Sequence, residues 1–342
     1  MKLRDTVYVA DHRARIGVEK GALRIKMPDG DSVRIPLEGV ERIVLLGRSS
    51  ISNALMAECT RRAIRISAMN RSGRIRFMVG GPVGGNVLLR VAQVRAADKP
   101  TWSLAMARTI VAAKIHNSRQ VLLRWSWDLD GSDATFVSDL AERLTARIGA
   151  LGTAPDLDTV RGVEGDAARL HFKALGYVLN ARRLDVSLDH RNRRPPRDPM
   201  NAMLSFAYGL LTTEAVGAAE SVGLDPQIGF LHGLRPGRPS LALDLIEEMR
   251  APLVDRFVVG AVARRQVRLE HLEEIPGGAW RLTDDGRRQF LDLWEQFRVR
   301  AVGHPYLDRD VPIWALLNTQ AMLLARHLRG DLDAYPAWAA KG

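Results

Sequence analysis

Residues 229–255 contain the side chains best suited to binding a metal ion. Asp244 lies three residues before Glu247 and four before Glu248, so at helical spacing the three carboxylates share one face. Like charges at that spacing destabilise a helix unless a cation lies between them. His232 lies twelve residues before Asp244 in a loop with a glycine close on either side, and it reaches the same place if the loop folds back. The stretch therefore predicts half of a divalent-metal site.

The helix that carries these acids is expected over residues 241–250, with Ser240 as its N-cap. Acids clustered on a helix are more often a solvated face, and a single loop histidine is more often a hydrogen-bonded structural residue. Three neighbouring cations, Arg235, Arg238 and Arg250, favour the metal hypothesis. Arginines beside carboxylates are expected where a metal and a phosphate backbone share one site.

A hard cation needs a further carboxylate from another part of the chain. Glu164 is the best candidate, because Gly162 and Gly165 leave room for a ligand beside it and it is expected near the start of a helix over 163–180. The alternative is a first-turn glutamate favoured by the helix dipole. The residues alone leave these two explanations open.

The composition is that of a globular protein with room for two domains. The chain has 342 residues, 46% of them hydrophobic and 26% charged, and contains no run of eighteen apolar residues. Its first residues carry charges and no apolar segment, which argues against a secretory signal. The single cysteine, Cys59, excludes an intrachain disulfide and a cysteine-based zinc site. We expect a cytoplasmic protein with no membrane association.

The net charge of +11 indicates a polyanionic partner. Only seven of the 50 basic residues are lysine, and guanidinium suits phosphate geometry better than ammonium does. A genome rich in arginine codons would explain arginine over lysine, but not the net excess. Residues 182–197 form a basic loop that we expect to contact phosphates. Its arginines are Arg182, Arg183, Arg191, Arg193, Arg194 and Arg197.

Element patterns predict an α+β protein with two domains. Residues 1–95 alternate in short strand-like runs with polar turns and one helix, which predicts a small N-terminal antiparallel β domain. Residues 96–342 read as a larger all-α domain with one small hairpin near 274–283. A helix over 199–215, capped by Asp198, is apolar on most of its surface and is expected to be buried. The tail after residue 331 is expected to fray.

Five motifs in this order resemble the CRISPR-associated Cas-one family, the integrase and endonuclease of spacer acquisition. They are AKIHNSRQVLL (113–123), GVEGDAARLHF (162–172), NAMLSFAYGLL (201–211), GLDPQIGFLHG (223–233) and LALDLIEEMRAPLVDR (241–256). The family's N-terminal β domain matches the pattern of residues 1–95. The resemblance therefore covers nearly the whole chain.

The resemblance implies a catalytic site and its cofactor. The family's metal triad falls on Glu164, His232 and Glu247, which would hold Mg²⁺ or Mn²⁺, with Asp244 as the neighbouring acid. Glu248 is the alternative to Glu247 as the inward ligand. Arg250, one turn beyond Glu247, is the candidate phosphate contact. One departure from the family motif is His171, which stands where the motif commonly has tyrosine.

The resemblance also implies partners and a reaction. The chain would form a homodimer through the β domain and bind double-stranded DNA and a small partner, Cas-two. It would insert short DNA fragments into a repeat array by attack of a 3′-hydroxyl on a phosphodiester. Two other functions remain open from the residues: a non-catalytic DNA-binding scaffold, and a metal-dependent hydrolase of small phosphate esters. The second leaves the net positive charge unexplained.

Overall fold

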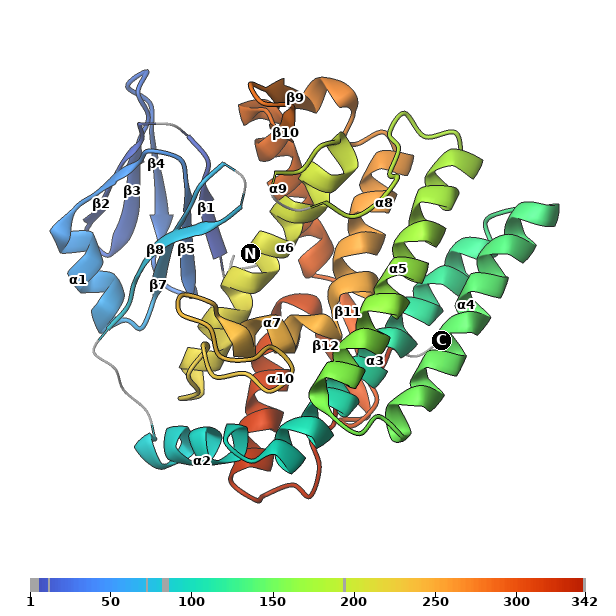
Figure 1. Cartoon of the computed structure of the whole chain (residues 1–342). Helices are drawn as coiled ribbons and strands as arrows, with labels where there is room; N and C mark the ends of the chain where they lie inside the picture. The colour runs from blue at the N-terminus through green and yellow to red at the C-terminus, as the bar shows by residue number, and fades with distance from the viewer. Residues whose placement is uncertain (1–5, 12, 72, 82–85, 193–194, 341–342) are drawn as a thin grey trace.

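The computed structural model describes residues 6–11, 13–71, 73–81, 86–192 and 195–340 of the chain. A β-rich part lies on one side of the molecule and a larger helical part on the other (Figure 1). The α+β prediction is confirmed. The predicted domain boundary near residue 95 falls within a helix, α2 (Val87–Ala97), which lies at the bottom of Figure 1 and packs against α3 (Pro100–Ser126) and α10 (Ile313–Leu328) of the helical part.

The β-rich part contains two four-stranded sheets. The first has the order β1-β5-β7-β8, with strands Thr6–Val9, Arg42–Leu46, Arg65–Met69 and Ile75–Val79. The second has the order β4-β3-β2-β6, with strands Ser32–Pro36, Ala22–Lys26, Arg15–Glu19 and Ser50–Ile51.

The sheets are mixed, where the sequence predicted an antiparallel domain. Strand β5 pairs in parallel with β1 and with β7, and β2 pairs in parallel with β6. Parallel neighbours need a crossover, and helix α1 (Asn53–Arg61) lies in the connection between β5 and β7. All five residues of β5 are buried, as expected for a strand covered on both faces.

The helical part follows the predicted order with shifted bounds. Its long helices are α3 (Pro100–Ser126), α4 (Gly131–Gly152), α5 (Leu157–Ala181), α6 (Pro199–Ser221), α9 (Asp284–Arg298) and α10 (Ile313–Leu328). The predicted hairpin is present as β9 (Leu272–Ile275) and β10 (Ala279–Leu282), after the short helix η2 (Leu269–His271). A second hairpin, β11 (Ala301–His304) with β12 (Arg309–Pro312), was not predicted.

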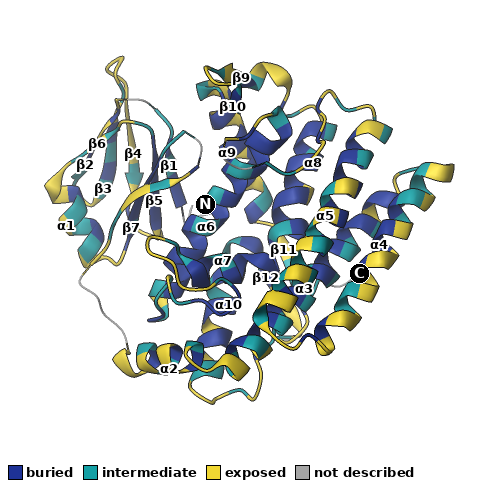
Figure 2. Cartoon of the chain, in the orientation of Figure 1, coloured by how far each residue is buried: buried dark blue, intermediate teal, exposed yellow. Residues whose placement is uncertain are grey.

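Helix α6 forms the centre of the molecule and the contact with the β-rich part. Asp198 caps it by accepting a hydrogen bond from the Asn201 amide at 2.7 Å, as predicted, and most of its side chains are buried (Figure 2). Buried Glu214 lies 3.9 Å from Arg42 of β5 and 3.4 Å from Arg298 of α9. The ion pairs join both parts of the chain around α6.

The segment that carries the acids is a broken helix. The α-helix α7 spans Ser240–Glu247, with Ser240 as its first residue and not its cap. A π-helical turn, η1 (Arg250–Asp255), follows and leads into α8 (Arg256–Ala263). Pro252 lies in this turn, and a proline has no backbone N–H to donate to a regular helix. The predicted helix over 241–250 therefore ends earlier, and the wider turn changes the direction of the side chains that follow.

The C-terminal tail is packed, which corrects the prediction that it frays. Tyr335 and Trp338 are 4% and 2% exposed. The Trp338 indole donates to the Gly303 carbonyl at 3.0 Å, and the Ala340 amide donates to Asn117 at 2.8 Å. The tail therefore packs against α3 and the second hairpin. Among the residues that the structure describes, none of the helices combines the length and the apolar character that a membrane span requires.

Candidate metal and nucleic-acid site

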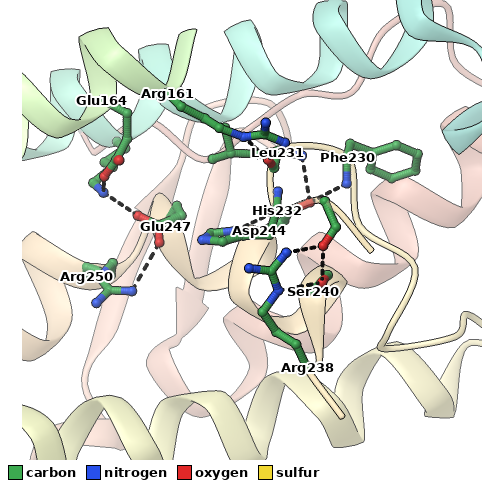
Figure 3. A network of polar contacts seen from close by, with 12 residues as sticks. Arg161, Glu164, Phe230, Leu231, His232, Arg238, Ser240, Asp244, Glu247 and Arg250 are labelled. Carbon is green, nitrogen blue, oxygen red and sulfur yellow. Dashed lines mark hydrogen bonds and ion pairs between the residues drawn. The ribbon is translucent and has the colours of Figure 1, made fainter. Parts of the chain in front are cut away.

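Asp244 holds the histidine loop against α7 (Figure 3). Its carboxylate accepts hydrogen bonds from the backbone amides of Phe230, Leu231 and His232 at 2.6, 3.1 and 3.0 Å. The approach is close enough that a Cβ on Gly229 would lie 2.7 Å from the Asp244 Oδ2 atom. Glycine is therefore required there, and Asp244 is 1% exposed with its oxygens occupied by the loop.

The same carboxylate orients the imidazole of His232. The Nδ1 atom of His232 lies 2.7 Å from the Asp244 Oδ1 atom. Because a carboxylate accepts, Nδ1 carries the proton and the lone pair of Nε2 is available for a metal. This geometry is that of a residue that positions the histidine.

Glu247 is a buried carboxylate surrounded by cations. Its Oε1 atom lies 3.0 Å from the Arg250 guanidinium and its Oε2 atom 2.5 Å from the Lys114 ammonium (Figure 3). Burial alone would raise the pKa of Glu247, but Arg250, Lys114 and His232 lower it to about 2. The group is therefore ionised at any physiological pH, and its Oε2 atom is paired with the Lys114 ammonium.

Glu164 comes from α5 and meets the same lysine. Its Oε1 atom forms an ion pair with Lys114, whose side chain is 11% exposed. Helix α5 begins at Leu157 with Asp156 as its cap, so Glu164 lies two turns inside the helix and is not a first-turn residue. The helix-dipole explanation is thereby removed. Glu164 and His232 line a common cleft of about 510 Å³ whose rim carries Arg161, Arg235 and Arg238.

Glu248 faces away from this cluster. Its carboxylate accepts hydrogen bonds from Tyr335 at 2.7 Å, from Gln320 at 3.1 Å and from the Trp338 amide. Burial raises the pKa of Glu248 to about 7. The structure thus separates the two adjacent glutamates: Glu247 points to Glu164 and His232, and Glu248 points to the C-terminal tail.

The tail contact predicts a stability effect without a functional one. Tyr335→Phe removes a hydroxyl that donates to a buried carboxylate, so we expect the free energy of unfolding to fall by about 1–2 kcal/mol. Urea unfolding measures this difference. Tyr306→Phe, at a tyrosine that is 49% exposed, is the matched control and is expected to change little. Equal stability of the two variants would contradict the assignment.

Beyond Arg250 lies a buried network that the sequence did not predict. The Arg250 guanidinium stacks 4.1 Å from the centre of the Tyr208 ring, and the Tyr208 hydroxyl donates to Asp255. The Nε2 atom of His171 lies 2.8 Å from the other oxygen of Asp255. The π-helical turn carries both Arg250 and Asp255. His171 therefore supports the wall behind Glu247 and, being 4% exposed, does not face a phosphate.

The arginines of the predicted basic loop lie in different places. Arg193 and Arg194 fall outside the described residues. Arg182 lies 2.8 Å from Asp128, and exposed Arg183 follows it. Both lie eighteen or more residues after Glu164 along or just beyond α5, a separation of roughly 27 Å at the helical rise of 1.5 Å per residue. The structure does not bring these two arginines to the carboxylate cluster.

A second, larger cavity lies beside Glu247 and is lined by arginines. Its volume is about 920 Å³, and it lies among the β7–β8 turn, α6, α7 and the β9–β10 hairpin. Seven arginines line it: Arg48, Arg71, Arg74, Arg76, Arg191, Arg250 and Arg281. Trp280 lies in the same wall. Because Arg250 both lines this cavity and pairs with Glu247, the cavity adjoins the carboxylate cluster. Most of these residues are far from Glu164 and Glu247 in the sequence. The spacing of residues along the chain therefore could not predict this cavity.

The donor set fits a divalent cation, although in this conformation a lysine takes part in the cluster. Two carboxylates from α5 and α7 already share one cation, Lys114, and His232 presents a nitrogen with a free lone pair. Carboxylate and imidazole ligands suit Mg²⁺ and Mn²⁺. Within the residues that the structure describes, no three His, Cys, Asp or Glu side chains converge closely enough to hold a metal together. The Lys114 ammonium is paired with both the Glu164 and the Glu247 carboxylates.

Comparison with known proteins agrees with the motifs. The family model described as CRISPR associated protein Cas1 matches residues 7–296. A CRISPR-associated endonuclease Cas1 of Rhodospirillum rubrum is 41% identical over 342 residues, covering 98% of each chain. A solved Cas6-RT-Cas1–Cas2 complex has a TM-score of 0.83 at 21% identity, covering 100% of this chain and 37% of that one. A casposase bound to integration product has a TM-score of 0.82 at 20% identity, covering 96% of this chain and 92% of that one. The two solved structures show the likeness of fold, and the family match with the close relative shows that this chain belongs to the Cas1 family.

Proposed function

We propose that this chain is a divalent-metal-dependent DNA endonuclease and integrase that joins short DNA fragments to a repeat array. The observation that carries the proposal is the meeting of Glu164 and Glu247 around one cation, beside His232 with its Nε2 atom free. The Cas1 relative named an endonuclease supports nuclease chemistry. The casposase of similar fold, solved with its integration product, supports joining as a second use of the fold.

Glu164, His232 and Glu247 would hold Mg²⁺ or Mn²⁺. Such an ion supplies Lewis-acid polarisation of a phosphoryl oxygen and stabilises charge on the attacking or leaving oxygen. Glu247 is ionised because Arg250 and Lys114 stabilise its charge, so it is ready to bind a cation without losing a proton. Asp244 keeps the His232 ring in one tautomer and one orientation. Arg250 pairs with Glu247 from the opposite side. The Arg250 guanidinium is itself held by stacking on the Tyr208 ring, whose hydroxyl donates to Asp255.

The reaction is an in-line displacement at phosphorus. The 3′-hydroxyl oxygen of the incoming strand forms a bond to the target phosphorus, and the bond from that phosphorus to the target's own 3′-oxygen breaks. The hydroxyl proton is lost to solvent, and the released 3′-oxygen takes up a proton. Water in place of the 3′-hydroxyl gives strand cleavage by the same geometry. One site therefore supports both activities.

The arginine cavity is proposed as the place where a DNA backbone approaches this site. Arginines bind phosphates without reading sequence, and an aromatic side chain such as Trp280 offers a surface for stacking a base. The cleft beside His232 carries Arg161, Arg235 and Arg238. Cationic surfaces thus lie on two sides of the carboxylate cluster, which fits a reaction between two DNA segments. Arg182, Arg183, Arg193 and Arg194 remain proposed contacts for more distant phosphates.

Two exposed arginines of the cavity allow a test of DNA binding. Replacing Arg74 and Arg76 together by Glu is expected to weaken binding of duplex DNA about tenfold at physiological salt. The salt dependence of log affinity should become shallower by about two, one for each lost phosphate contact. Fluorescence anisotropy at several salt concentrations measures both. The control reverses the same charge at Arg95 and Arg309, which are exposed and do not line this cavity. Equal losses in both double variants would reject the cavity as the contact surface.

The partners are proposed from the family and from the solved complex of similar fold. The Cas1 part of that complex is assembled with Cas2, and we propose a small Cas2 partner for this chain. A homodimer through the β-rich part remains a proposal from the resemblance. Size measurement of the chain alone and with its partner tests both assemblies.

The experiment that tests the reaction uses wild-type protein with its partner. A labelled DNA duplex is incubated with a supercoiled repeat-bearing plasmid, in Mn²⁺ or in EDTA. Metal-dependent transfer of label into the plasmid supports an integrase. Tight DNA binding with no cleavage or joining would support the alternative, a non-catalytic scaffold. Turnover of simple phosphate esters without DNA affinity would support a small-molecule hydrolase.

A further inference from the structure

Lys114 occupies the point at which the two carboxylates meet. Its ammonium pairs with the Glu164 Oε1 atom and lies 2.5 Å from the Glu247 Oε2 atom (Figure 3 draws both glutamates). The side chain comes from α3, so three elements, α3, α5 and α7, meet at one charge. We propose that Lys114 is a built-in counter-cation that competes with the divalent metal for Glu164 and Glu247.

The electrostatics require a cation at this point in the metal-free protein. Glu247 is 4% exposed, and the nearby Glu164 side chain is 26% exposed. Two carboxylates this close repel each other, and burial of an ionised group is costly unless it is paired. Arg250 neutralises Glu247 through its Oε1 atom, whereas Lys114 is the cation that reaches both glutamates. The lysine therefore keeps the metal-free site compact.

The two available cations differ in how far they can move. Arg250 stacks on the Tyr208 ring and belongs to the π-helical turn, so its position is fixed by packing. Lys114 has four rotatable methylene groups and a compact charge, and its amine can leave without moving the backbone. A divalent ion held by Glu164 and Glu247 would compete with the ammonium for the same carboxylates. The displaced ammonium would then lie beside the bound phosphate, where a positive charge is favourable.

The inference rests on the proposed function, because it concerns the same metal site. It makes a separate statement, namely that metal affinity is limited by an internal competitor. The apparent affinity for a ligand falls with the fraction of molecules whose site is open to it, so a lysine that fills the site in about nine-tenths of molecules weakens metal binding about tenfold. Removing the charge of Lys114 should therefore tighten metal binding while it loosens the metal-free protein.

The test compares wild type with Lys114→Met and Lys114→Gln. Calorimetric titration with Mn²⁺, without DNA, should give a dissociation constant about tenfold lower for both variants. In EDTA both should unfold at a lower temperature than wild type, and added Mn²⁺ should raise their Tm by more. Lys114→Arg keeps the positive charge and should not tighten binding. Lys173→Met removes one lysine charge from a place over the Phe136 ring and is the matched control.

The outcomes separate this inference from the proposed function. Unchanged Mn²⁺ affinity in Lys114→Met and Lys114→Gln, with normal binding by wild type, would overturn the competition and leave the metal site standing. An equal gain in Lys173→Met would also overturn it, as an effect of net charge alone. Absence of Mn²⁺ binding to wild type and to both variants would overturn the proposed metal site and the inference together.

Discussion

Glu247→Gln is expected to lower the rate of metal-dependent DNA cleavage and joining by about 10³-fold or more. The amide keeps the shape of the side chain and a hydrogen-bond acceptor for Arg250, but it removes a charge from the ligand set. Loss of a supporting contact to a metal ligand already costs ten- to 100-fold, and loss of a ligand costs more. Single-turnover kinetics with a labelled substrate at saturating Mn²⁺ measures the effect.

The adjacent residue supplies the control. Glu248→Gln makes the same chemical change one position later, on a side chain that contacts Tyr335, Gln320 and Trp338. Its cleavage rate should stay within about threefold of wild type, because this side chain faces the tail. If Glu248→Gln were the inactive variant and Glu247→Gln the active one, the orientation of the two glutamates would be wrong.

Asp244→Ala is expected to lower the free energy of unfolding by about 3–5 kcal/mol. The change leaves three backbone amides without their acceptor, the buried ones of Phe230 and Leu231 and the part-buried one of His232. Such a loss is a large part of a total stability of roughly 5–15 kcal/mol. Urea unfolding of the metal-free protein measures it.

A milder variant separates the two roles of Asp244. Asp244→Asn retains one acceptor oxygen and should fold, but it no longer fixes the His232 ring through a charged partner. Its Mn²⁺ affinity should fall between tenfold and 100-fold. Asp225→Asn is the control, because Asp225 caps a turn of the same loop region by accepting from the Gln227 amide. Wild-type metal affinity in Asp244→Asn would show that the histidine does not depend on this contact.

The sequence predicted the acids of the site better than it predicted their surroundings. Helical spacing and motif order placed Glu164, His232 and Glu247 together, and the structure brings Glu164 and Glu247 to one lysine. Lys114 lies in the first quoted motif, yet spacing cannot show that α3 packs against both α5 and α7. Arg182 and Arg183 were predicted from charge density alone. The length of α5 separates them from Glu164. The density of charge along the sequence does not predict how far apart these side chains lie in the fold.

Features of the fold that depend on residues close together in the sequence were predictable. The pairing of strands that lie far apart in the sequence was not. The Asp198 cap and the hairpin of β9 and β10 follow from local chemistry and are present. Parallel pairing of β5 depends on neighbours more than ten residues away in sequence. The short strands alone favoured an antiparallel arrangement. The tail was expected to fray because it is polar near Asp331, but Trp338 inserts beside α3 through contacts that only the tertiary structure provides.

The most direct test of the metal triad is strand transfer into a repeat-bearing plasmid by wild type, Glu164→Ala and His232→Ala. Each protein is assayed with the small partner, in Mn²⁺ and in EDTA, after confirmation that folding and DNA binding are intact. We expect wild type to join DNA in Mn²⁺ only, and both variants to lose joining. Joining that survives both substitutions would mean that the metal is held elsewhere, and the proposed site would be wrong.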